Sequence, residues 1–189
     1  MLGQSAISPV TCADSASVCV FKTAVGWVGI AGQGHVLSSL VFGYDTEGEA
    51  LTRFRPVLMA GGEIADWNPE LRLRLQRYLG GDGSGDFQDV DTVATESTPF
   101  AARVIAAVRS IPAGEVKSYA EVAAAAGSAK ASRAVGNIMA RNRIPLVIPC
   151  HRVVASGGRL GGFSSPRGLD MKTTLLRLEG AISSAEENL

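Results

Sequence analysis

The stretch that decides the fold of this 189-residue chain is residues 118–141, SYAEVAAAAGSAKASRAVGNIMAR. Ser118 and Glu121 have the S-x-x-E spacing of a capping box, which marks the first turn of a helix. Gly127 follows a run of alanines, and glycine is the residue that most often ends a helix in the left-handed conformation. The sequence therefore predicts a short helix between Ser118 and Gly127.

A second short helix is expected over residues 131–141, after a turn that contains Gly127. Apolar residues recur along it at helical spacing and form an inward face: Val135, Ile138 and Met139. Two short helices joined by a glycine-containing turn form a helix-turn-helix pattern. In that motif the first helix crosses the nucleic-acid backbone and the second enters a groove.

The outward face of this second helix carries mostly small side chains. Four of its residues are small: Ala131, Ser132, Ala134 and Gly136. Arg133 stands among them, whereas a helix that reads bases in the major groove carries several long polar side chains. Small residues allow close approach to a sugar-phosphate surface, so the pattern favours sequence-independent binding, including in the minor groove. The alternative is a helix-packing face along which one arginine extends to solvent.

The charge of the chain is unevenly distributed. Its 18 Lys and Arg residues balance 18 Asp and Glu residues, which taken alone argues against a highly charged partner. Residues 1–100 carry six basic and twelve acidic residues, a net charge of −6, and residues 101–189 carry the reverse, a net charge of +6. This asymmetry suggests that the second half faces nucleic acid, and chance scatter of surface charge is the alternative.

Composition excludes several classes of protein. With 46% hydrophobic and 19% charged residues, the chain is an ordinary globular sequence rather than a disordered one. No apolar run approaches the roughly 18 residues that cross a bilayer, and the first residues lack the basic and apolar regions of a secretory signal. We therefore expect no membrane association and a cytoplasmic location, or a nuclear one in a eukaryote.

Cysteine and histidine are sparse, which argues against a metal centre. The chain has three cysteines, an odd number that favours reduced thiols inside the cell. Cys12, Cys19 and His35 could supply three ligands, but no closely spaced CxxC pair supports a zinc site. We expect no metal.

The first half predicts a small antiparallel sheet followed by a helix. Residues 18–42 alternate apolar runs with turns, and a hairpin turn is expected at 32–34, GQG. Asn68 and Pro69 form a helix start, with asparagine as the cap and proline in the first turn. The buried face of that helix is expected to consist of Leu71, Leu75 and Leu79.

Residues 80–97, GGDGSGDFQDVDTVATES, predict a linker and so a boundary between two domains. Residues 1–97 would form an N-terminal domain of sheet and helix, and residues 98–189 a second domain that carries the helix-turn-helix pattern and binds DNA. Thr98 and Pro99 open a further helix, and its segment buries Val104, Ile105, Val108 and Ile111. The expected fold class is α+β, with a helical, winged helix-turn-helix-like second domain.

Residues 145–154, PLVIPCHRVV, form the chemical centre. An extended apolar segment would bring Cys150 next to His151, with Arg152 beyond. A thiol reacts as the thiolate, and neighbouring His and Arg side chains can lower a cysteine pKa from its ordinary value of about 8.5. Successive side chains of a strand point to opposite faces, so the pair works only if the chain turns here or a water bridges it. The alternative is an inert cysteine in an apolar core.

These motifs resemble the O6-alkylguanine-DNA alkyltransferase family, whose members repair alkylated guanine by moving the alkyl group onto their own cysteine. The resemblance rests on IPAGEVKSY, KASRAVGNIMARN, IPCHRVV, LGGFSS and KTTLLRLEG. It covers residues 98–180, whereas the first half is similar only in its first hairpin. Phe163 stands where the family has tyrosine, and Ser165 and Pro166 stand where it commonly has paired glycines.

The resemblance implies a role for each residue around the cysteine. Cys150 would be the alkyl acceptor, and His151 its general base through a water, oriented by Glu179. Asn142 would order the turn behind the active site. Tyr119 would contact the flipped guanine and help to protonate it as it leaves.

The resemblance also implies how the substrate is held. Arg133 would fill the gap left by the extruded nucleotide. The small residues beside it would lie against the DNA: Ala131, Ser132, Ala134 and Gly136. The backbones of Cys150 and Val153, together with Ser164, would recognise the base. The pocket would be lined by Met139, Pro145 and Phe163.

The implied activity is that of a methylated-DNA–protein-cysteine S-methyltransferase, which acts once per molecule and needs no cofactor. Its partner would be double-stranded DNA containing O6-alkylguanine, flipped out of the stack because the O6 position lies inside the duplex. We expect a monomer in solution, with cooperative binding on DNA as a further possibility. Two alternatives stay open, a non-catalytic alkyltransferase-like protein that binds lesions and a winged-helix transcription regulator. Cys150 argues against the first, because such proteins lack the acceptor cysteine.

Overall fold

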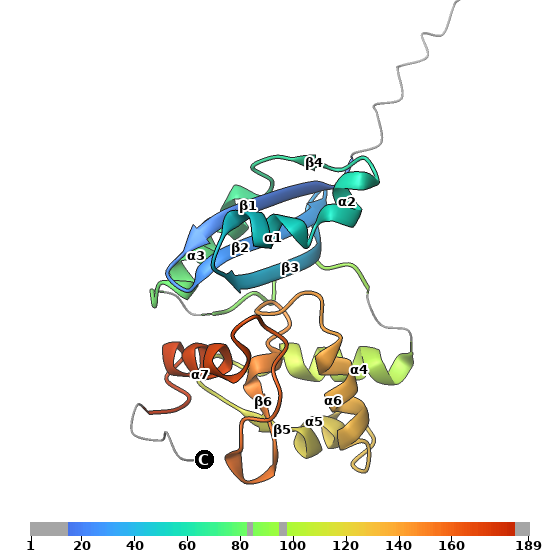
Figure 1. Ribbon diagram of the computed structural model, residues 1–189. Helices are drawn as coiled ribbons and strands as arrows, with labels where there is room; N and C mark the ends of the chain where they lie inside the picture. The colour runs from blue at the N-terminus through green and yellow to red at the C-terminus, as the bar shows by residue number, and fades with distance from the viewer. Residues whose placement is uncertain (1–14, 83–84, 95–97, 184–189) are drawn as a thin grey trace, which may run out of the picture.

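The computed structural model describes residues 15–82, 85–94 and 98–183. The first half is a sheet with helices on both faces, and the second half is built mainly of helices (Figure 1). The first half contains β1 (Ser17–Thr23), β2 (Gly26–Gln33), β3 (Val36–Tyr44), α1 (Glu47–Thr52), α2 (Arg55–Met59), β4 (Glu63–Ile64) and α3 (Pro69–Leu79). The second half contains α4 (Pro99–Arg109), β5 (Lys117–Ser118), α5 (Tyr119–Ala125), α6 (Ser132–Ala140), η1 (Cys150–Arg152), β6 (Val153–Val154), η2 (Ser156–Gly158) and α7 (Gly168–Leu178). This is the predicted α+β class.

Three long strands form the predicted antiparallel sheet. The strand order is β3-β2-β1-β4, and the two-residue strand β4 pairs with β1 in parallel, an addition that the sequence did not indicate. The hairpin turn predicted at 32–34 is displaced, because Gln33 still pairs with Val36. The turn therefore lies at Gly34 and His35, where Gly34 adopts φ +58°. Glycine takes this left-handed conformation without steric cost.

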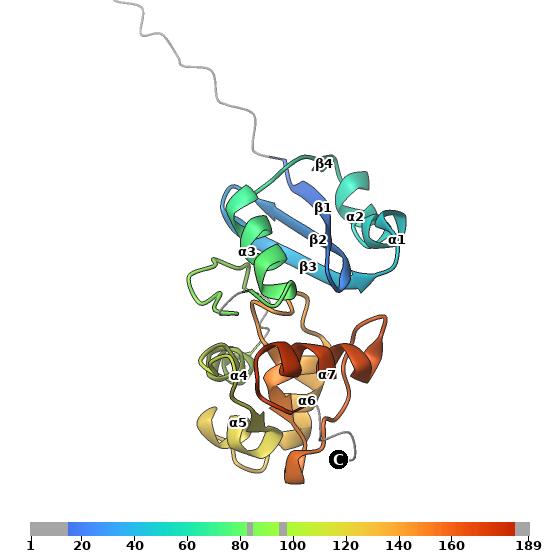
Figure 2. The same cartoon turned by 90° about the vertical axis from the view of Figure 1, so that its left-hand side faces the viewer.

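Helices cover both faces of the sheet (Figure 2). On one face lies α3, whose buried residues include the predicted set Leu71, Leu75 and Leu79. Its predicted cap is confirmed, since the side chain of Asn68 accepts a hydrogen bond from the backbone of Leu71. On the opposite face lie α1 and α2, where Phe54 packs against Val18 and Ala31. The helices therefore bury both sides of a sheet that would otherwise expose apolar residues.

The predicted capping signals of the second half are confirmed. Thr98 caps α4 by accepting a hydrogen bond from Ala101 N. Ser118 and Glu121 form both hydrogen bonds of the capping box at the start of α5. Gly127, with φ +82°, follows the end of α5. The predicted buried set of the first helical segment is also confirmed: Val104, Ile105, Val108 and Ile111.

The two helices α5 and α6 pack together beside α4 and form the predicted helix-turn-helix arrangement (Figures 1 and 2). Val135 and Met139 of α6 are buried, and Ile138 is partly buried against the core. The short strands β5 and β6 pair in parallel next to α5. This pairing brings the residues after η1 beside the start of the first helix of the motif.

One hydrophobic cluster includes residues from both halves, from Leu37 of β3 to Leu175 of α7. The described part of the predicted linker takes part in this core, because Phe87 and Val90 are buried. Arg109 of α4 donates to the carbonyl oxygens of Gln88 and Val90 at 2.8 and 2.9 Å. Residues 83–84 and 95–97 of the linker lie outside the described residues. The described part of the predicted linker is therefore packed against the rest of the protein. The domain boundary at residue 97 stays a prediction.

No helix in the described ranges is long and apolar enough to cross a membrane. Among the described residues, no group of three or more His, Cys, Asp or Glu side chains could hold a metal ion. Cys12 and the N-terminal residues considered for a secretory signal lie outside those residues. The other two members of the weighed ligand set lie in separate surroundings: Cys19 is buried beside Asp66, and His35 lies 3.3 Å from Asp91.

Candidate active site

Cys150 begins η1, directly after a tight turn. The sequence predicts an extended segment here, and this prediction is wrong. Ile148 N donates to Ile144 O at 2.9 Å, and Leu146 adopts φ +72° between them. The turn allows the apolar side chains of the segment to be buried together: Ile144, Leu146, Val147 and Ile148. Because η1 is a helical turn, Cys150 and His151 are not forced onto opposite faces as in a strand.

Asn142 closes this turn with both ends of its side-chain amide. Its Nδ2 donates to Ile148 O at 2.8 Å, and its Oδ1 accepts from Ile144 N at 3.0 Å. These two bonds satisfy backbone groups that the turn leaves without strand or helix partners. Asn142 therefore stabilises the turn that precedes Cys150, and its role in the reaction stays a prediction.

The thiol of Cys150 is almost enclosed, with 9% of the residue exposed. Burial raises its pKa, and the Asn142 side chain, the charge of Lys172 and nearby backbone N–H groups offset this only in part. The neighbouring His and Arg side chains therefore do not lower this pKa, because burial dominates and the guanidinium of Arg152 donates to Ile111, Gly85 and Glu179 instead. At neutral pH the thiol therefore keeps its proton and needs a base to become a nucleophile.

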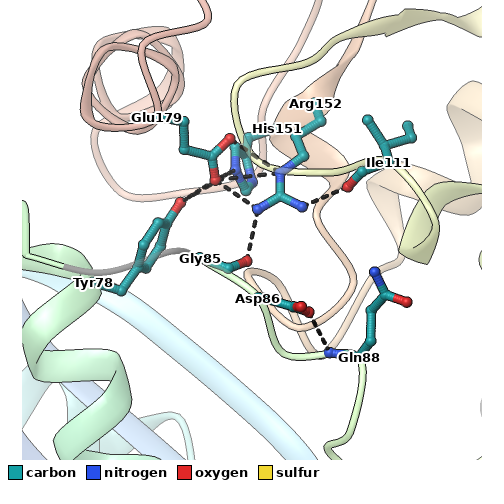
Figure 3. Close-up of polar contacts among 8 residues, drawn as sticks. All are labelled: Tyr78, Gly85, Asp86, Gln88, Ile111, His151, Arg152 and Glu179. Atoms are coloured by element: carbon teal, nitrogen blue, oxygen red, sulfur yellow. Dashed lines mark hydrogen bonds and ion pairs between the residues drawn. The ribbon is translucent and has the colours of Figure 1, made fainter.

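Glu179 is the centre of a buried hydrogen-bond network (Figure 3). Its Oε1 accepts from the Tyr78 hydroxyl at 2.6 Å and from Arg152 Nη2 at 2.7 Å. The same oxygen lies 3.0 Å from Nε2 of His151. Burial by itself would raise the pKa of Glu179, but the hydrogen bonds from these three side chains outweigh burial and lower it to about 2. The carboxylate is therefore charged at neutral pH.

The ring of His151 is fully buried and contacts Glu179 through Nε2. A charged carboxylate only accepts hydrogen bonds, so this contact assigns a hydrogen to Nε2 and leaves the lone pair on Nδ1. Nδ1 is buried and has no hydrogen-bond partner within the described residues. Burial lowers the pKa of His151, and Glu179 opposes that shift only in part. The imidazole is therefore neutral at pH 7, with Nδ1 available to accept a proton.

Arg152 is a buried cation with a partner for each arm of its guanidinium (Figure 3). Its Nε lies 3.0 and 3.2 Å from the two oxygens of Glu179. Its Nη1 donates to Ile111 O at 2.6 Å, and its Nη2 donates to Gly85 O at 2.8 Å. These contacts tie η1 to the residue after α7, to the end of the α4 segment and to the segment after α3.

Lys172 is a second buried cation, with no exposed surface. Its Nζ donates to Val153 O at 2.6 Å and also to Leu160 O. Lys172 thereby joins β6 to the loop that carries Phe163. Burial lowers the pKa of Lys172 to about 8, although the nearby Cys150 opposes the shift. The amine is charged at neutral pH and lies close enough to Cys150 to influence the thiol.

An open hollow of about 510 Å³ lies over α5 and α6. It brings together four of the predicted site residues: Tyr119, Ser132, Arg133 and Gly136. Arg133 is exposed, whereas Tyr119 is partly buried. Burial, followed by the influence of Cys150, raises the pKa of the Tyr119 hydroxyl. Tyr119 therefore connects the hollow with the surroundings of the thiol, which is itself not among the residues that line the hollow.

A second hollow, of about 1150 Å³, lies where the two halves meet, and Asn142, Pro145 and Ser164 are among its lining residues. The structure therefore does not place Pro145 and Ser164 in the hollow that contains Tyr119. Phe163 packs against Phe42 of β3, with 6.2 Å between the ring centroids. In this conformation the apolar ring of the loop is partly buried against the first half.

The remaining predicted residues lie in the helix and the core. Met139 and Val153 are buried, Ala131 is partly buried, and Ala134 is exposed on α6. Met139 and Val153 line neither of the two hollows. The roles that the resemblance implies for these residues, and for the rest of the site, stay predictions.

Sequence reasoning missed three buried polar residues: Tyr78, Arg152 as the partner of Glu179, and Lys172. Arg152 was visible in the CHR motif but was considered only as a neighbour of the thiol. Lys172 lies in the KTTLLRLEG motif, three positions before Leu175 on the buried face of α7. Tyr78 has the spacing of the buried face of α3, three positions after Leu75. No local signal shows that its hydroxyl reaches Glu179.

A helix-turn-helix beside a buried cysteine, with a neutral histidine held by a carboxylate, defines a class of DNA-handling proteins with a reactive thiol. The family model described as 6-O-methylguanine DNA methyltransferase, DNA binding domain, matches residues 99–181. A Methanosarcina barkeri protein named methylated-DNA–protein-cysteine methyltransferase is 42% identical over 144 residues, which cover 66% of this chain and 90% of that protein. The chain therefore belongs to the methylated-DNA–protein-cysteine methyltransferase family.

Solved structures show the same similarity across both halves. The Mycobacterium tuberculosis O6-methylguanine methyltransferase has a TM-score of 0.72 and 30% identity, covering 90% of this chain and 96% of that one. A crystal structure of M. tuberculosis OGT in complex with DNA has a TM-score of 0.71 and 30% identity, covering 87% and 93% of the two chains.

Proposed function

We propose that this protein repairs double-stranded DNA by transferring the alkyl group of O6-alkylguanine irreversibly to Cys150. The observation that carries the proposal is the enclosed Cys150 thiol, adjacent in sequence to a neutral His151 whose Nε2 is held by the charged Glu179. The names of the relatives point to the same reaction. Neither a lesion-binding protein without catalysis nor a transcription regulator needs this arrangement.

DNA would dock on α5 and α6, where the first hollow opens. The related OGT has been crystallised with DNA, which supports DNA as the partner of this chain. Flipping a base out of the duplex costs a few kcal/mol. Arg133 is exposed at the hollow and would offset part of this cost by filling the gap in the stack. Phosphate contacts from the basic second half would supply most of the remaining affinity and would weaken with salt.

The reaction begins with activation of the thiol. The thiol proton passes through a water to Nδ1 of His151, which becomes imidazolium. Glu179 stabilises this cation through Nε2 at 3.0 Å. Since burial raises the pKa of Cys150, the thiolate forms mainly when His151 takes the proton.

The transfer itself is an in-line displacement at the alkyl carbon. The Cys150 sulfur donates an electron pair to form the S–C bond, and the C–O6 bond breaks with its pair going to the base. Tyr119 would donate its proton to the departing guanine and recover one from solvent, so that the products are S-alkylcysteine and neutral guanine. A thioether has no good leaving group for water, so each protein molecule acts once.

The flipped base would be recognised by the backbones of Cys150 and Val153 and by Ser164. Met139, Pro145 and Phe163 would line its pocket, which requires the Phe163 loop to approach the hollow over α6. Ala131, Ser132, Ala134 and Gly136 would allow α6 to approach the sugar-phosphate backbone closely. The protein would act as a monomer in the compartment that holds its DNA, the cytoplasm or a nucleus.

The proposal is tested by incubating the protein with a duplex that carries one O6-methylguanine, followed by digestion and peptide mass measurement. We expect one added methyl group on the peptide that contains Cys150. The Cys150→Ala protein should remain unmodified, whereas Cys19→Ala, which removes another buried thiol, should be methylated like the unaltered protein.

The other functions predict different outcomes. Tight binding to the lesion with an unmodified Cys150 would overturn the proposal and indicate a lesion-binding protein. Preference for one DNA sequence regardless of damage would indicate a transcription regulator.

A further inference from the structure

Tyr78 is the contribution of the first half to the hydrogen-bond network around Glu179 (Figure 3). It lies at the last turn of α3, is 3% exposed, and reaches across 101 positions of sequence to Glu179. Its hydroxyl donates to Glu179 Oε1 at 2.6 Å. The same hydroxyl oxygen lies 3.4 Å from Nε2 of His151.

The ring of Tyr78 is held in place on two sides. Its edge packs against Phe87, with ring centroids 5.7 Å apart and an interplanar angle of 81°. Gly85 lies so close that a Cβ there would meet the Tyr78 ring at 2.7 Å and Glu179 Oε1 at 3.2 Å. Gly85 also has φ +61°, which favours glycine. The segment after α3 therefore fits around the tyrosine and fixes where its hydroxyl points.

The Tyr78 hydroxyl can donate only one hydrogen bond. A phenol has one hydrogen, and Tyr78 gives it to the charged oxygen of Glu179. Towards His151 the hydroxyl then presents a lone pair. A lone pair is compatible with an N–H at Nε2 and is repelled by a second lone pair there. Tyr78 and Glu179 thus disfavour the same histidine tautomer, the one that would put the hydrogen on Nδ1.

We propose that Tyr78 is a positioning residue for alkyl transfer, which holds Glu179 and keeps His151 in the tautomer with a free Nδ1. This inference rests on the proposed function for its consequence in catalysis. Its structural part, the state of the His151 ring, can be tested without any transfer of an alkyl group. The first half would then take part in the acceptor site, because the Tyr78 hydroxyl holds Glu179.

The first test measures the ring directly in the unaltered protein. Nitrogen chemical shifts of ¹⁵N-labelled His151 at neutral pH should show a neutral ring with its hydrogen on Nε2. A hydrogen on Nδ1 would overturn the inference. His35 serves as an internal reference because it is exposed, and this measurement needs no variant that could fail to fold.

The second test uses Tyr78→Phe, which keeps the ring and removes the hydroxyl. We expect the rate constant for methyl transfer to fall roughly tenfold, as for the loss of one hydrogen bond to a charged group. Glu179, with one donor fewer, would become a stronger acceptor and raise the pKa of His151. The acid limb of the rate profile should therefore move to higher pH. The charged and titratable groups around His151 that remain in both proteins are Cys150, Arg152, Lys172 and Glu179.

Two comparisons separate positioning from packing. Tyr44→Phe removes a hydroxyl from a tyrosine of β3 and should leave the rate and its pH profile unchanged. In a Glu179→Gln background, Tyr78→Phe should have little further effect on the rate, because both changes act through one network. Additive effects, or a Tyr78→Phe protein with unaltered rate and pH profile, would overturn the inference. Failure of the unaltered protein to accept a methyl group would instead overturn the proposed function, and the tautomer measurement would still stand.

Discussion

Arg152 and Glu179 form an ion pair that is closed to solvent, with Nη2 and Oε1 2.7 Å apart and side chains that are 4% and 1% exposed. A buried pair loses the hydration of both charges, and only close geometry with further hydrogen bonds compensates that loss. Here Tyr78 and His151 add contacts to the carboxylate, and two backbone carbonyls accept from the guanidinium. The pair is therefore sensitive to the removal of either partner.

Replacing Arg152 with Met should strongly destabilise the fold. The change leaves a buried carboxylate without its cation, which typically costs about 3–5 kcal/mol of unfolding free energy. Urea denaturation at pH 7 would measure the loss. The matched control is Arg72→Met, which breaks the more exposed pair with Asp66 and should cost less than about 1 kcal/mol. Equal losses in the two variants would contradict the role assigned to the buried pair.

Acid should weaken the fold through Glu179. Its folded pKa of about 2 is below the unfolded value of 4.5, so its contribution to stability is complete above pH 4.5 and is lost as the pH falls towards 2. The shift corresponds to about 3 kcal/mol. The difference in unfolding free energy between the unaltered protein and Glu179→Gln should narrow by that amount between pH 6 and pH 2.5. A constant difference over this range would show that Glu179 is not held as an anion.

Alkali should stabilise the fold through Lys172, whereas acid destabilises it through Glu179. Its folded pKa of about 8 lies below the ordinary value of 10.5, so the unfolded chain binds more protons between these two pH values. Stability from this group should therefore increase as the pH rises from 8 to 10.5. Lys172→Met should lack this increase when unfolding free energies are compared at pH 7.5 and pH 10. A parallel pH dependence in both proteins would contradict a lowered pKa of Lys172 in the folded protein.

Replacing Asn142 should change the apparent pKa of the Cys150 thiol as well as the stability of the turn before it. Asn142→Ala removes a donor to Ile148 O, which still accepts from Cys150 N, and the acceptor for Ile144 N. The unpaired Ile144 N should cost about 1–3 kcal/mol. Asn142→Asp keeps the acceptor but adds a negative charge near Cys150. The rate of iodoacetamide reaction with Cys150 against pH should therefore give a higher apparent pKa in Asn142→Asp than in Asn142→Ala. The reverse order would contradict the placement of this side chain beside the thiol.

Replacing Arg133 should slow methyl transfer from duplex DNA but not from the free base. If it fills the gap left by the flipped nucleotide, Arg133→Ala should slow methyl transfer from a duplex by at least about tenfold, or about 1.4 kcal/mol. Transfer from the free base O6-methylguanine should change less than about twofold. Arg55→Ala, on α2 of the first half, should leave both rates unchanged. A loss of activity towards the free base as well would place Arg133 in the reaction rather than in base flipping.

Local signals predicted α3, α4, α5 and α6, whereas the short helices α1 and α2 were not predicted. The caps at Asn68, Thr98 and Ser118 depend on residues three positions apart, and the buried leucines of α3 follow the helical period. Such patterns are complete within a few residues, so the sequence alone reveals them. They also positioned the helix-turn-helix and the cysteine beside it.

Contacts between distant residues were not predictable in the same way. Nothing near Tyr78 indicates a partner 101 positions later, because its spacing only shows that the ring is buried. The apolar run before Cys150 indicates a strand. The side chain of Asn142 provides hydrogen bonds that stabilise a turn there instead. The thiol pKa depends on the burial of Cys150, which only the packed structure determines.

Several basic side chains of the second half donate hydrogen bonds to backbone carbonyls and so stabilise the fold. Arg103 donates to Ala126 O at 2.8 Å, as Arg109, Arg152 and Lys172 donate to other backbone carbonyls. Arg103, Arg109 and Arg152 each donate to a helix end or an irregular segment, and Lys172 donates to β6 and to the loop after it. A count of twelve basic residues therefore overstates how many counterions DNA binding would release. The salt dependence of binding should be shallower than that count suggests, because part of the charge is already committed to the protein itself.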